Sequence, residues 1–242
     1  MESWRLLRTW DGAPGWNMGL DEAFLVLPHD RPTLRFYTWS PPTLSLGYFQ
    51  RARDVPSLDR AEAAVRRLTG GGAIHHAAEL TFSIGAPADH ALYRGDVRAS
   101  YARVHAVIAA ALATFDVHAD ERGARRLRSD RETSGMCFEH SSDVDLVWGE
   151  RKGVGSAQRR TRGRVLHHGS VKLAPSALDE SVAGVHDRAP GVTAAEVGAR
   201  IAEEFERLLG VALVEGEPTA EEARHARERT AHFTSEAFLR RR

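Results

Sequence analysis

The stretch DVDLVWGERKGVGSAQRRTRGRVLHHGSVKL, residues 143–173, decides the fold class of this chain of 242 residues. Apolar and polar side chains alternate in three runs, at 143–148, 153–160 and 164–173, and short segments containing glycine separate these runs. A period of two places successive side chains on opposite faces of a strand, and such short connections join antiparallel strands. The stretch therefore predicts three consecutive antiparallel β-strands.

The rest of the chain mixes strands and helices without a regular βαβ rhythm. Turn residues and alternating patterns predict further strands over 4–10, 33–39, 43–49 and 80–86, and a strand, glycine turn and strand within 65–76. Helical periodicity, with Asn17 as an N-cap, predicts helices over 17–27, 57–64, 97–114, 193–209 and 218–231. We expect one α+β domain over 1–242, with a mixed, largely antiparallel sheet flanked by helices and a helical C-terminal portion over 175–242.

Composition limits the class of protein. Hydrophobic residues make up 42% of the chain, which is enough for a core, and a net charge of zero gives no global attraction to nucleic acid or membrane. The N-terminus lacks the apolar run of a signal peptide, and no segment reaches membrane-spanning length. The single cysteine excludes a disulfide framework and a multi-thiolate zinc site. We therefore expect a soluble cytoplasmic protein without a metal site.

Cys137 and Lys152 are the first candidates for chemistry. Cys137 is the only cysteine, and Lys152 is one of only two lysines among 33 basic residues. Lysine is a compact charge with a tunable pKa, so a lysine kept in an arginine-rich chain indicates a special position. An ammonium group near a thiol favours the nucleophilic thiolate, which suggests acyl transfer. A buried, inert cysteine is the alternative that the sequence leaves open.

Three consecutive glycines at 70–72 follow Arg66 and Arg67. Glycine permits positive φ and a close approach of backbone N–H groups to a ligand, and arginine can bind a phosphate or carboxylate. A flexible hairpin turn explains the same residues. The loop is neither a P-loop nor a dinucleotide fingerprint, because the GK[ST] and GxGxxG patterns are absent. Small residues over 153–158 would also let a substrate approach the backbone beside Lys152.

Two histidine pairs and two arginine clusters are weaker candidates. Neighbours on a strand point to opposite faces, so neither 75–76 nor 167–168 can bind one metal through both rings. We interpret the four histidines as partly exposed structural residues. Arginine runs usually form solvated surface, and here they favour an acidic protein partner over nucleic acid. The clusters comprise Arg122, Arg125, Arg126, Arg128 and Arg131, and Arg159, Arg160, Arg162 and Arg164.

Seven ordered motifs carry a family resemblance: NMGLDEA (17–23), LRFYTWSPPTLSLGYFQ (34–50), RRLTGGGAIHH (66–76), ELTFSI (79–84), MCF (136–138), RKGVGSAQRR (151–160) and LHHGS (166–170). Over nearly its whole length the chain resembles the biotin/lipoate protein ligase superfamily. The resemblance implies the α+β sheet domain shared with biotin ligases and class II tRNA synthetases. Lipoate–protein ligases of this superfamily use ATP to form lipoyl-AMP and then acylate a lysine. Cysteine-type octanoyltransferases instead take octanoate from acyl carrier protein through an enzyme thioester.

The motifs favour the transferase. Cys137-Phe138 looks like the transferase nucleophile motif, ELTFSI is similar to the transferase continuation after the glycine loop, and the chain ends soon after the catalytic domain. TGGGAIH (69–75) is closer to the ligase loop, and His76 stands where both groups usually have Asp.

The resemblance thus implies a ping-pong octanoyltransferase that needs no cofactor. Cys137 would carry the octanoyl group, with Lys152 beside it and the acyl chain along 34–48. Acyl carrier protein would be the donor, and a lipoyl domain or glycine cleavage H protein the acceptor, without nucleic acid or membrane partners. Expected substrate-binding residues are Arg67, Gly70, Gly71, Gly72, Ala73, His75, Ser156, Ala157 and His168. The alternatives are a lipoate–protein ligase that uses ATP and Mg, and a non-catalytic relative that binds a carrier or nucleic acid.

Overall fold

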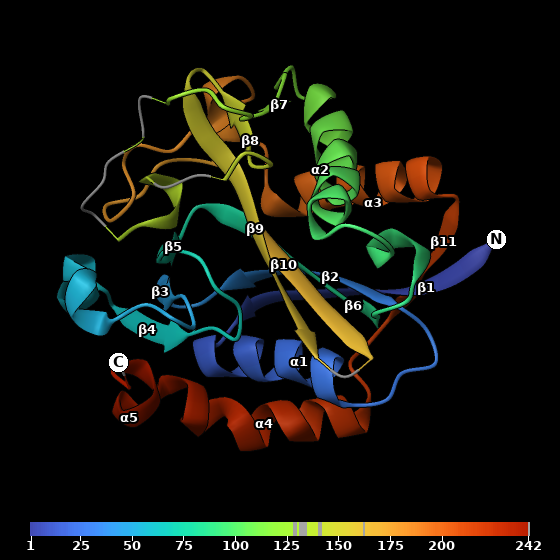
Figure 1. Cartoon of the computed structure of the whole chain (residues 1–242), viewed down its shortest axis with the longest axis horizontal. Helices are drawn as coiled ribbons and strands as arrows, with labels where there is room; N and C mark the ends of the chain where they lie inside the picture. Colours follow the sequence, from blue (N-terminus) through green and yellow to red (C-terminus); the bar gives the residue numbers. More distant parts are fainter. Residues whose placement is uncertain (128–129, 131–134, 140–141, 162, 242) are drawn as a thin grey trace.

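The computed structural model describes residues 1–127, 130, 135–139, 142–161 and 163–241 (Figure 1). Within these residues the main sheet has eight strands in the order β11-β1-β2-β6-β10-β9-β8-β7, and a smaller sheet has the order β4-β3-β5. The strands are β1 (Glu2–Gly12), β2 (Thr33–Trp39), β3 (Thr43–Leu46), β4 (Ala63–Arg66), β5 (Ile74–His76), β6 (Glu79–Pro87), β7 (Asp120–Glu121), β8 (Leu146–Trp148), β9 (Arg151–Thr161), β10 (Arg164–Lys172) and β11 (Val211–Gly216).

Helices cover both faces of the main sheet. Helices α1 and α4 pack against each other on one face, and α2 and α3 lie on the other (Figure 1). The α-helices are α1 (Pro14–Val26), α2 (Val97–Ala113), α3 (Ala194–Leu209), α4 (Ala220–Thr234) and α5 (Glu236–Leu239). The 3₁₀ helices are η1 (Ala52–Asp54), η2 (Pro56–Arg60), η3 (Ala91–Tyr93), η4 (Cys137–Glu139) and η5 (Val185–Asp187).

Strand directions confirm the predicted α+β fold with a mixed, largely antiparallel sheet. The sequence β2-β6-β10-β9-β8 pairs antiparallel throughout, and it includes the three strands predicted within 143–173. Strand β1 pairs in parallel with both β2 and β11. The middle of the sheet therefore presents β6, β9 and β10 side by side, and these strands position the site described below.

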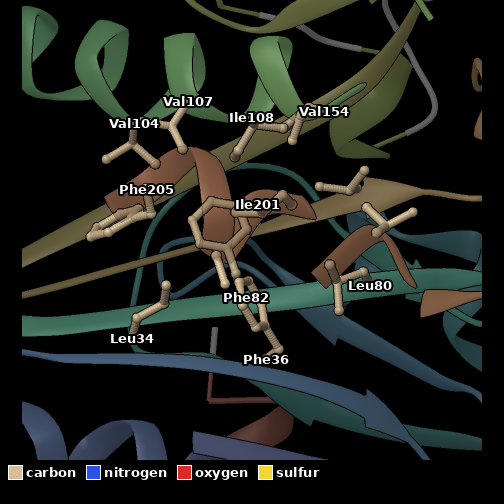
Figure 2. Close-up of a cluster of buried hydrophobic side chains, with 14 of the residues drawn as sticks. Leu34, Phe36, Leu80, Phe82, Val104, Val107, Ile108, Val154, Ile201 and Phe205 are labelled. Atoms are coloured by element: carbon tan, nitrogen blue, oxygen red, sulfur yellow. The ribbon is translucent and has the colours of Figure 1, made fainter. Parts of the chain in front are cut away.

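The main core lies between the sheet and helices α2 and α3. Figure 2 shows Phe36 of β2 and Phe82 of β6 pointing toward Ile201 and Phe205 of α3, all within one buried cluster. Burying apolar area of this kind contributes about 25 cal/mol per Å². Arg35 precedes Phe36 on β2, and its side chain lies on the opposite face of the sheet. The residues two positions from Arg35 along the strand share that face, as the period of two requires.

That opposite face of β2 carries buried polar groups instead. Arg35 Nη1 and Tyr37 Oη each lie 3.0 Å from a carboxylate oxygen of Asp21 on α1. Burial raises the pKa of Asp21, but hydrogen bonding from His168 and the charge of Arg35 outweigh it and hold the pKa below its usual value. The carboxylate therefore ties α1 to β2 and β10 in its ionised form.

Two local predictions in the first third of the chain differ from the structure. The first helix begins at Pro14, with Ala13 as N-cap, because proline is well suited to the first helical turn. Asn17 is buried inside the helix, where its amide donates to the carbonyl oxygens of Gly12 and Thr38. The predicted helix over 57–64 is correct only in part, since the 3₁₀ helix η2 ends at Arg60 and the chain then enters β4, which pairs in parallel with β3. Tertiary pairing here outweighs the helix propensity of alanine.

Other elements differ in extent. The strand predicted over 43–49 ends at Leu46. The strand predicted over 143–148 is shorter than expected and forms β8 only over Leu146–Trp148. The C-terminal portion is not wholly helical, because β11 adds a strand beside β1. Among the described residues, no helix is both long and apolar enough to cross a membrane.

Candidate active site

Cys137 and Lys152 meet in the structure. Cys137 opens η4, and Lys152 lies near the start of β9. Lys152 Nζ is 3.4 Å from Cys137 Sγ and 3.2 Å from the Cys137 carbonyl oxygen. The lysine is 1% exposed, whereas the thiol is partly open to solvent. A buried cation thus lies beside a partly exposed sulfur.

Asp145 completes this arrangement, and the sequence analysis missed it. Its Oδ2 lies 2.8 Å from Lys152 Nζ, and both side chains are buried. Burial lowers the pKa of Lys152, but the charges of Asp145 and Cys137 outweigh it and raise the pKa above its ordinary value. Lys152 therefore stays protonated at neutral pH. In the sequence, Asp145 is recognisable only as an acidic residue next to the apolar run 146–148. An acid in such a place is usually interpreted as exposed to solvent.

Phe138 contacts both lysines of the chain. The ammonium groups of Lys152 and Lys172 lie 4.9 and 4.8 Å from the centre of its buried ring. Lys172 Nζ also lies 2.7 Å from Glu79 Oε2 and donates to the His75 carbonyl oxygen. Compact ammonium groups fit both positions, and the two cation–π contacts hold the residue after Cys137 in place.

The glycine loop holds the backbone of Cys137. Ala73 N donates to Gly135 O at 2.9 Å, and Cys137 N donates to Ala73 O at 2.7 Å. Gly71 has a φ of +92°, which glycine adopts readily. The hairpin alternative is wrong, because β4 and β5 do not pair with each other and instead flank β3. The loop therefore links the smaller sheet to Cys137.

Arg67 braces this loop from inside the protein. Its guanidinium donates to the carbonyl oxygens of Gly70 and Gly72, each at 2.7 Å, and to Ser45 O at 3.0 Å. Burial lowers the pKa of Arg67, and the nearby Cys137 partly opposes this change. The side chain lines the cavity described next, and its predicted contact with substrate stays a prediction.

A mostly apolar cavity of about 40 Å³, open at its mouth, leads inward from Cys137. Its wall includes Trp39 stacked on His76, with ring centres 4.3 Å apart. The lining residues are Met18, Tyr37, Trp39, Ser45, Arg67, Gly70, Gly71, Ile74, His76, Thr81, Cys137, Gly155, Ser156, Ala157, His168 and Gly169. Part of the predicted stretch 34–48 thus lines the cavity.

His168 lines the cavity with both ring nitrogens already bonded. Its Nδ1 lies 3.0 Å from Asp21 Oδ2, and its Nε2 lies 2.6 Å from Thr69 Oγ1. These contacts fix the ring against the wall. Gly72 and Ala73 are not among the lining residues, although they contact the Cys137 backbone. Their predicted roles in substrate binding stay predictions.

The other histidines are enclosed rather than partly exposed. His75 Nδ1 bonds Ser176 Oγ at 2.7 Å, away from the cavity lining, whereas His76 bonds Ser45 Oγ and lines the cavity. All four histidines of the two pairs are less than 9% exposed, so the expectation of partial exposure is wrong. Each ring is buried because its polar atoms find partners. No group of three potential metal ligands occurs in the described parts of the chain.

The arginine clusters are partly engaged in the fold. Arg122 pairs with Asp130 at 2.7 Å, and Arg159 donates to Leu68 O at 2.9 Å. Arg125 and Arg126 are exposed. Arg128, Arg131 and Arg162 lie outside the described residues. The expected contact with acidic partners stays a prediction.

Comparisons with known proteins agree with this geometry. Residues 13–206 match the family model of the lipoyl protein ligase A/B catalytic domain. Octanoyltransferase LipM of Moorella thermoacetica is 37% identical over 270 residues, covering 100% of this chain and 99% of the relative. Octanoyltransferase LipM of Kyrpidia tusciae is also 37% identical, with 98% of each chain covered.

A solved structure extends the likeness to three dimensions. A candidate lipoate protein ligase from T. acidophilum, with bound lipoic acid, superposes with a TM-score of 0.81 and 26% identity, and 100% of each chain is covered. The chain therefore belongs to the lipoyl protein ligase A/B catalytic domain family, among its LipM-like acyltransferases.

Proposed function

We propose that this acyltransferase moves an octanoyl group to a lysine of a lipoyl domain through a thioester on Cys137. The observation that carries the proposal is the contact of 3.4 Å between Lys152 Nζ and Cys137 Sγ at the mouth of an apolar cavity. The full-length likeness to two octanoyltransferases supports octanoyl transfer in protein lipoylation. Acyl carrier protein is the proposed donor, and the glycine cleavage H protein is a further proposed acceptor.

The first half-reaction is attack by the Cys137 thiolate on the donor thioester. A bond forms between Sγ and the acyl carbon, the bond to the donor sulfur breaks, and the donor leaves as a thiolate that solvent protonates. The protonated Lys152 balances the charge of the Cys137 sulfur before attack. Backbone N–H groups of Gly71, Gly72 or Ala157 are proposed to stabilise the transient oxyanion.

The second half-reaction is attack by a neutral acceptor lysine on octanoyl-Cys137. The amide bond forms, the bond from carbon to Sγ breaks, and Cys137 returns as the thiolate beside Lys152. The proton of the attacking amine passes to solvent. Since the donor thioester supplies the driving energy, the proposed reaction consumes no ATP and needs no metal ion.

A transfer assay tests the proposal. With octanoyl-acyl carrier protein and a lipoyl domain, but no ATP, the wild-type protein should octanoylate the acceptor lysine. Cys137→Ala should lose activity by about 10⁴-fold or more, and Cys137→Ser should keep only a slow trace. Appreciable transfer without ATP by Cys137→Ala would rule out the thioester route.

The lipoate–protein ligase remains the competing outcome. The glycine loop, TGGGAIH, resembles that of ligases, and the solved relative binds lipoic acid. A ligase would release pyrophosphate when given lipoate and ATP, and Cys137→Ala would leave that rate unchanged. The same purified variants therefore separate the two chemistries.

A further inference from the structure

A groove of about 440 Å³, open to solvent, adjoins the acyl cavity. The two share Gly70, Gly71, Ser156 and Ala157, so they meet beside Cys137. The lining residues of this groove are Gly70, Gly71, Val97, Arg98, Tyr101, Ser142, Asp143, Val144, Ser156, Ala157 and Gln158. A thioester has an acyl side and a thiol side. If the acyl chain fills the apolar cavity, the thiol side must extend into the groove.

The groove wall is polar where it passes α2. Tyr101 Oη accepts a hydrogen bond from Gln158 N at 2.8 Å, and the hydrogen of this phenol has no acceptor among the described residues. Gln158 Nε2 donates to Ser100 Oγ at 2.9 Å, which fixes the amide. Tyr101 can therefore donate to a carbonyl oxygen that lies in the groove.

The charged residues that line the groove favour an uncharged ligand. Arg98 is the only lysine or arginine among the lining residues, all of which belong to the described part of the chain. Its Nε lies 2.8 Å from Asp143 Oδ2, so the two charges balance at the outer end of the groove. A nucleotide triphosphate would need unpaired cations. A chain of methylene and amide groups needs only the apolar surface and isolated hydrogen-bonding groups found here.

We propose that this groove binds the amide-containing thiol arm of the acyl donor, a pantetheine-type chain, with Tyr101 donating to one of its amide carbonyl groups. The inference rests on the proposed function, because it places the reacting thioester at Cys137. The groove then selects donors by their thiol arm, while the cavity selects them by their acyl chain.

The experiment compares two donors with the same acyl group. Octanoyl-pantetheine carries the amide arm, and the octanoyl thioester of ethanethiol does not. Intact-protein mass spectrometry follows the rate at which each acylates Cys137 in the absence of acceptor. The wild-type protein should react at least about tenfold faster with octanoyl-pantetheine, as the loss of a few polar and apolar contacts would give.

Val97→Trp should fill the groove from the first turn of α2, where Val97 is 46% exposed. It should remove the preference for octanoyl-pantetheine, because the rate with that donor should fall toward the rate with the ethanethiol ester. Tyr101→Phe should reduce the preference by about threefold to tenfold through loss of one hydrogen bond. Ala106→Trp is the matched control, because Ala106 is exposed on α2 but does not line the groove, and it should keep the full preference.

The outcomes are separable. If Val97→Trp and Tyr101→Phe leave the preference unchanged, or slow both donors equally, the groove does not bind the arm. If the wild-type protein forms no Cys137 adduct with either donor, the thioester mechanism fails, and the role of the groove fails with it.

Discussion

At the scale of single residues, Gly155 leaves the space that the Lys152 ammonium occupies. A Cβ at this position would lie 2.5 Å from Lys152 Cε and 2.7 Å from Nζ. The end of a lysine side chain can move at little cost, so Gly155→Ala should displace the ammonium more than it destabilises the fold. We expect the rate of thioester formation to fall by about 10²-fold, as misplacement of a reacting group by about 1 Å does.

Mass spectrometry of samples quenched at set times measures the rate of thioester formation. Urea unfolding, done in parallel, measures the stability of the fold. Gly198→Ala is the control, because its Cβ would approach the nearest side chain, Phe36, no closer than 3.4 Å. A Gly155→Ala protein with the wild-type rate would show that the position of Lys152 does not matter.

Asp145 helps to keep Lys152 protonated, because its charge raises the pKa of the lysine against the effect of burial. In Asp145→Asn the carboxylate that raises the pKa of Lys152 is lost, while the burial that lowers it remains. The ammonium should then deprotonate at a lower pH, and the alkaline fall in the rate of thioester formation should shift to lower pH. A pH–rate profile of the first half-reaction measures this shift. An unchanged profile would remove Asp145 from the account.

At the scale of elements, the glycine loop and η4 form one unit around Cys137. A Cβ at Gly72 would lie 2.7 Å from Cys137 N and 2.8 Å from its Cα, which are backbone atoms that cannot yield cheaply. Gly72→Ala should therefore move the thiol away from Lys152 and slow thioester formation by about 10²-fold. Gly70→Ala, whose Cβ would meet only Phe49 at 3.8 Å, should lose much less. Equal rates for the two variants would contradict this link.

The elements also show what the sequence can predict. Period-two alternation identifies β2, β6, β9 and β10, because each has one face in the core. Alternation cannot reveal that β1 runs parallel to β2, since direction depends on the path of the chain between them. β11 was missed because its short run VALVEG follows directly on a helix. The predicted helix over 57–64 includes the first two residues of β4, because local alanine propensity cannot show the pairing of β4 with β3.

The candidate site, like the fold, can be predicted only in part from the sequence. The rarity of Lys152 and the single Cys137 could be recognised from composition, and the resemblance connected them. Asp145 could not be recognised, because an acid beside an apolar run looks solvated until the fold places Lys152 against it. The histidine pairs were misjudged for the same reason. Two of their partners lie more than 100 residues away in the chain, Ser176 for His75 and Asp21 for His168.

At the scale of the whole molecule, buried neutral histidines should make the fold sensitive to acid. Burial, with the charge of Lys172, lowers the pKa of His75 to about 4, and burial beside His105 lowers the pKa of His167 well below its usual value. Below about pH 6.5 the unfolded chain therefore binds protons that the folded chain does not. The free energy of unfolding should fall as the pH drops from about 6.5 to 4.

Urea unfolding at pH 7.5, 6 and 4.5 measures this trend. His75→Gln should make the dependence shallower, because one group that differs between the folded and unfolded states is gone. A free energy of unfolding that stays constant over this range would contradict the buried, neutral state of these histidines.

The most direct test of the central claim is the mass of the intact protein after mixing with octanoyl-acyl carrier protein in the absence of ATP. The account predicts a gain of one octanoyl group that hydroxylamine removes and that Cys137→Ala never acquires. A protein that gains no adduct, but forms an acyl-adenylate from lipoate and ATP, would contradict the account and make Cys137 a structural residue.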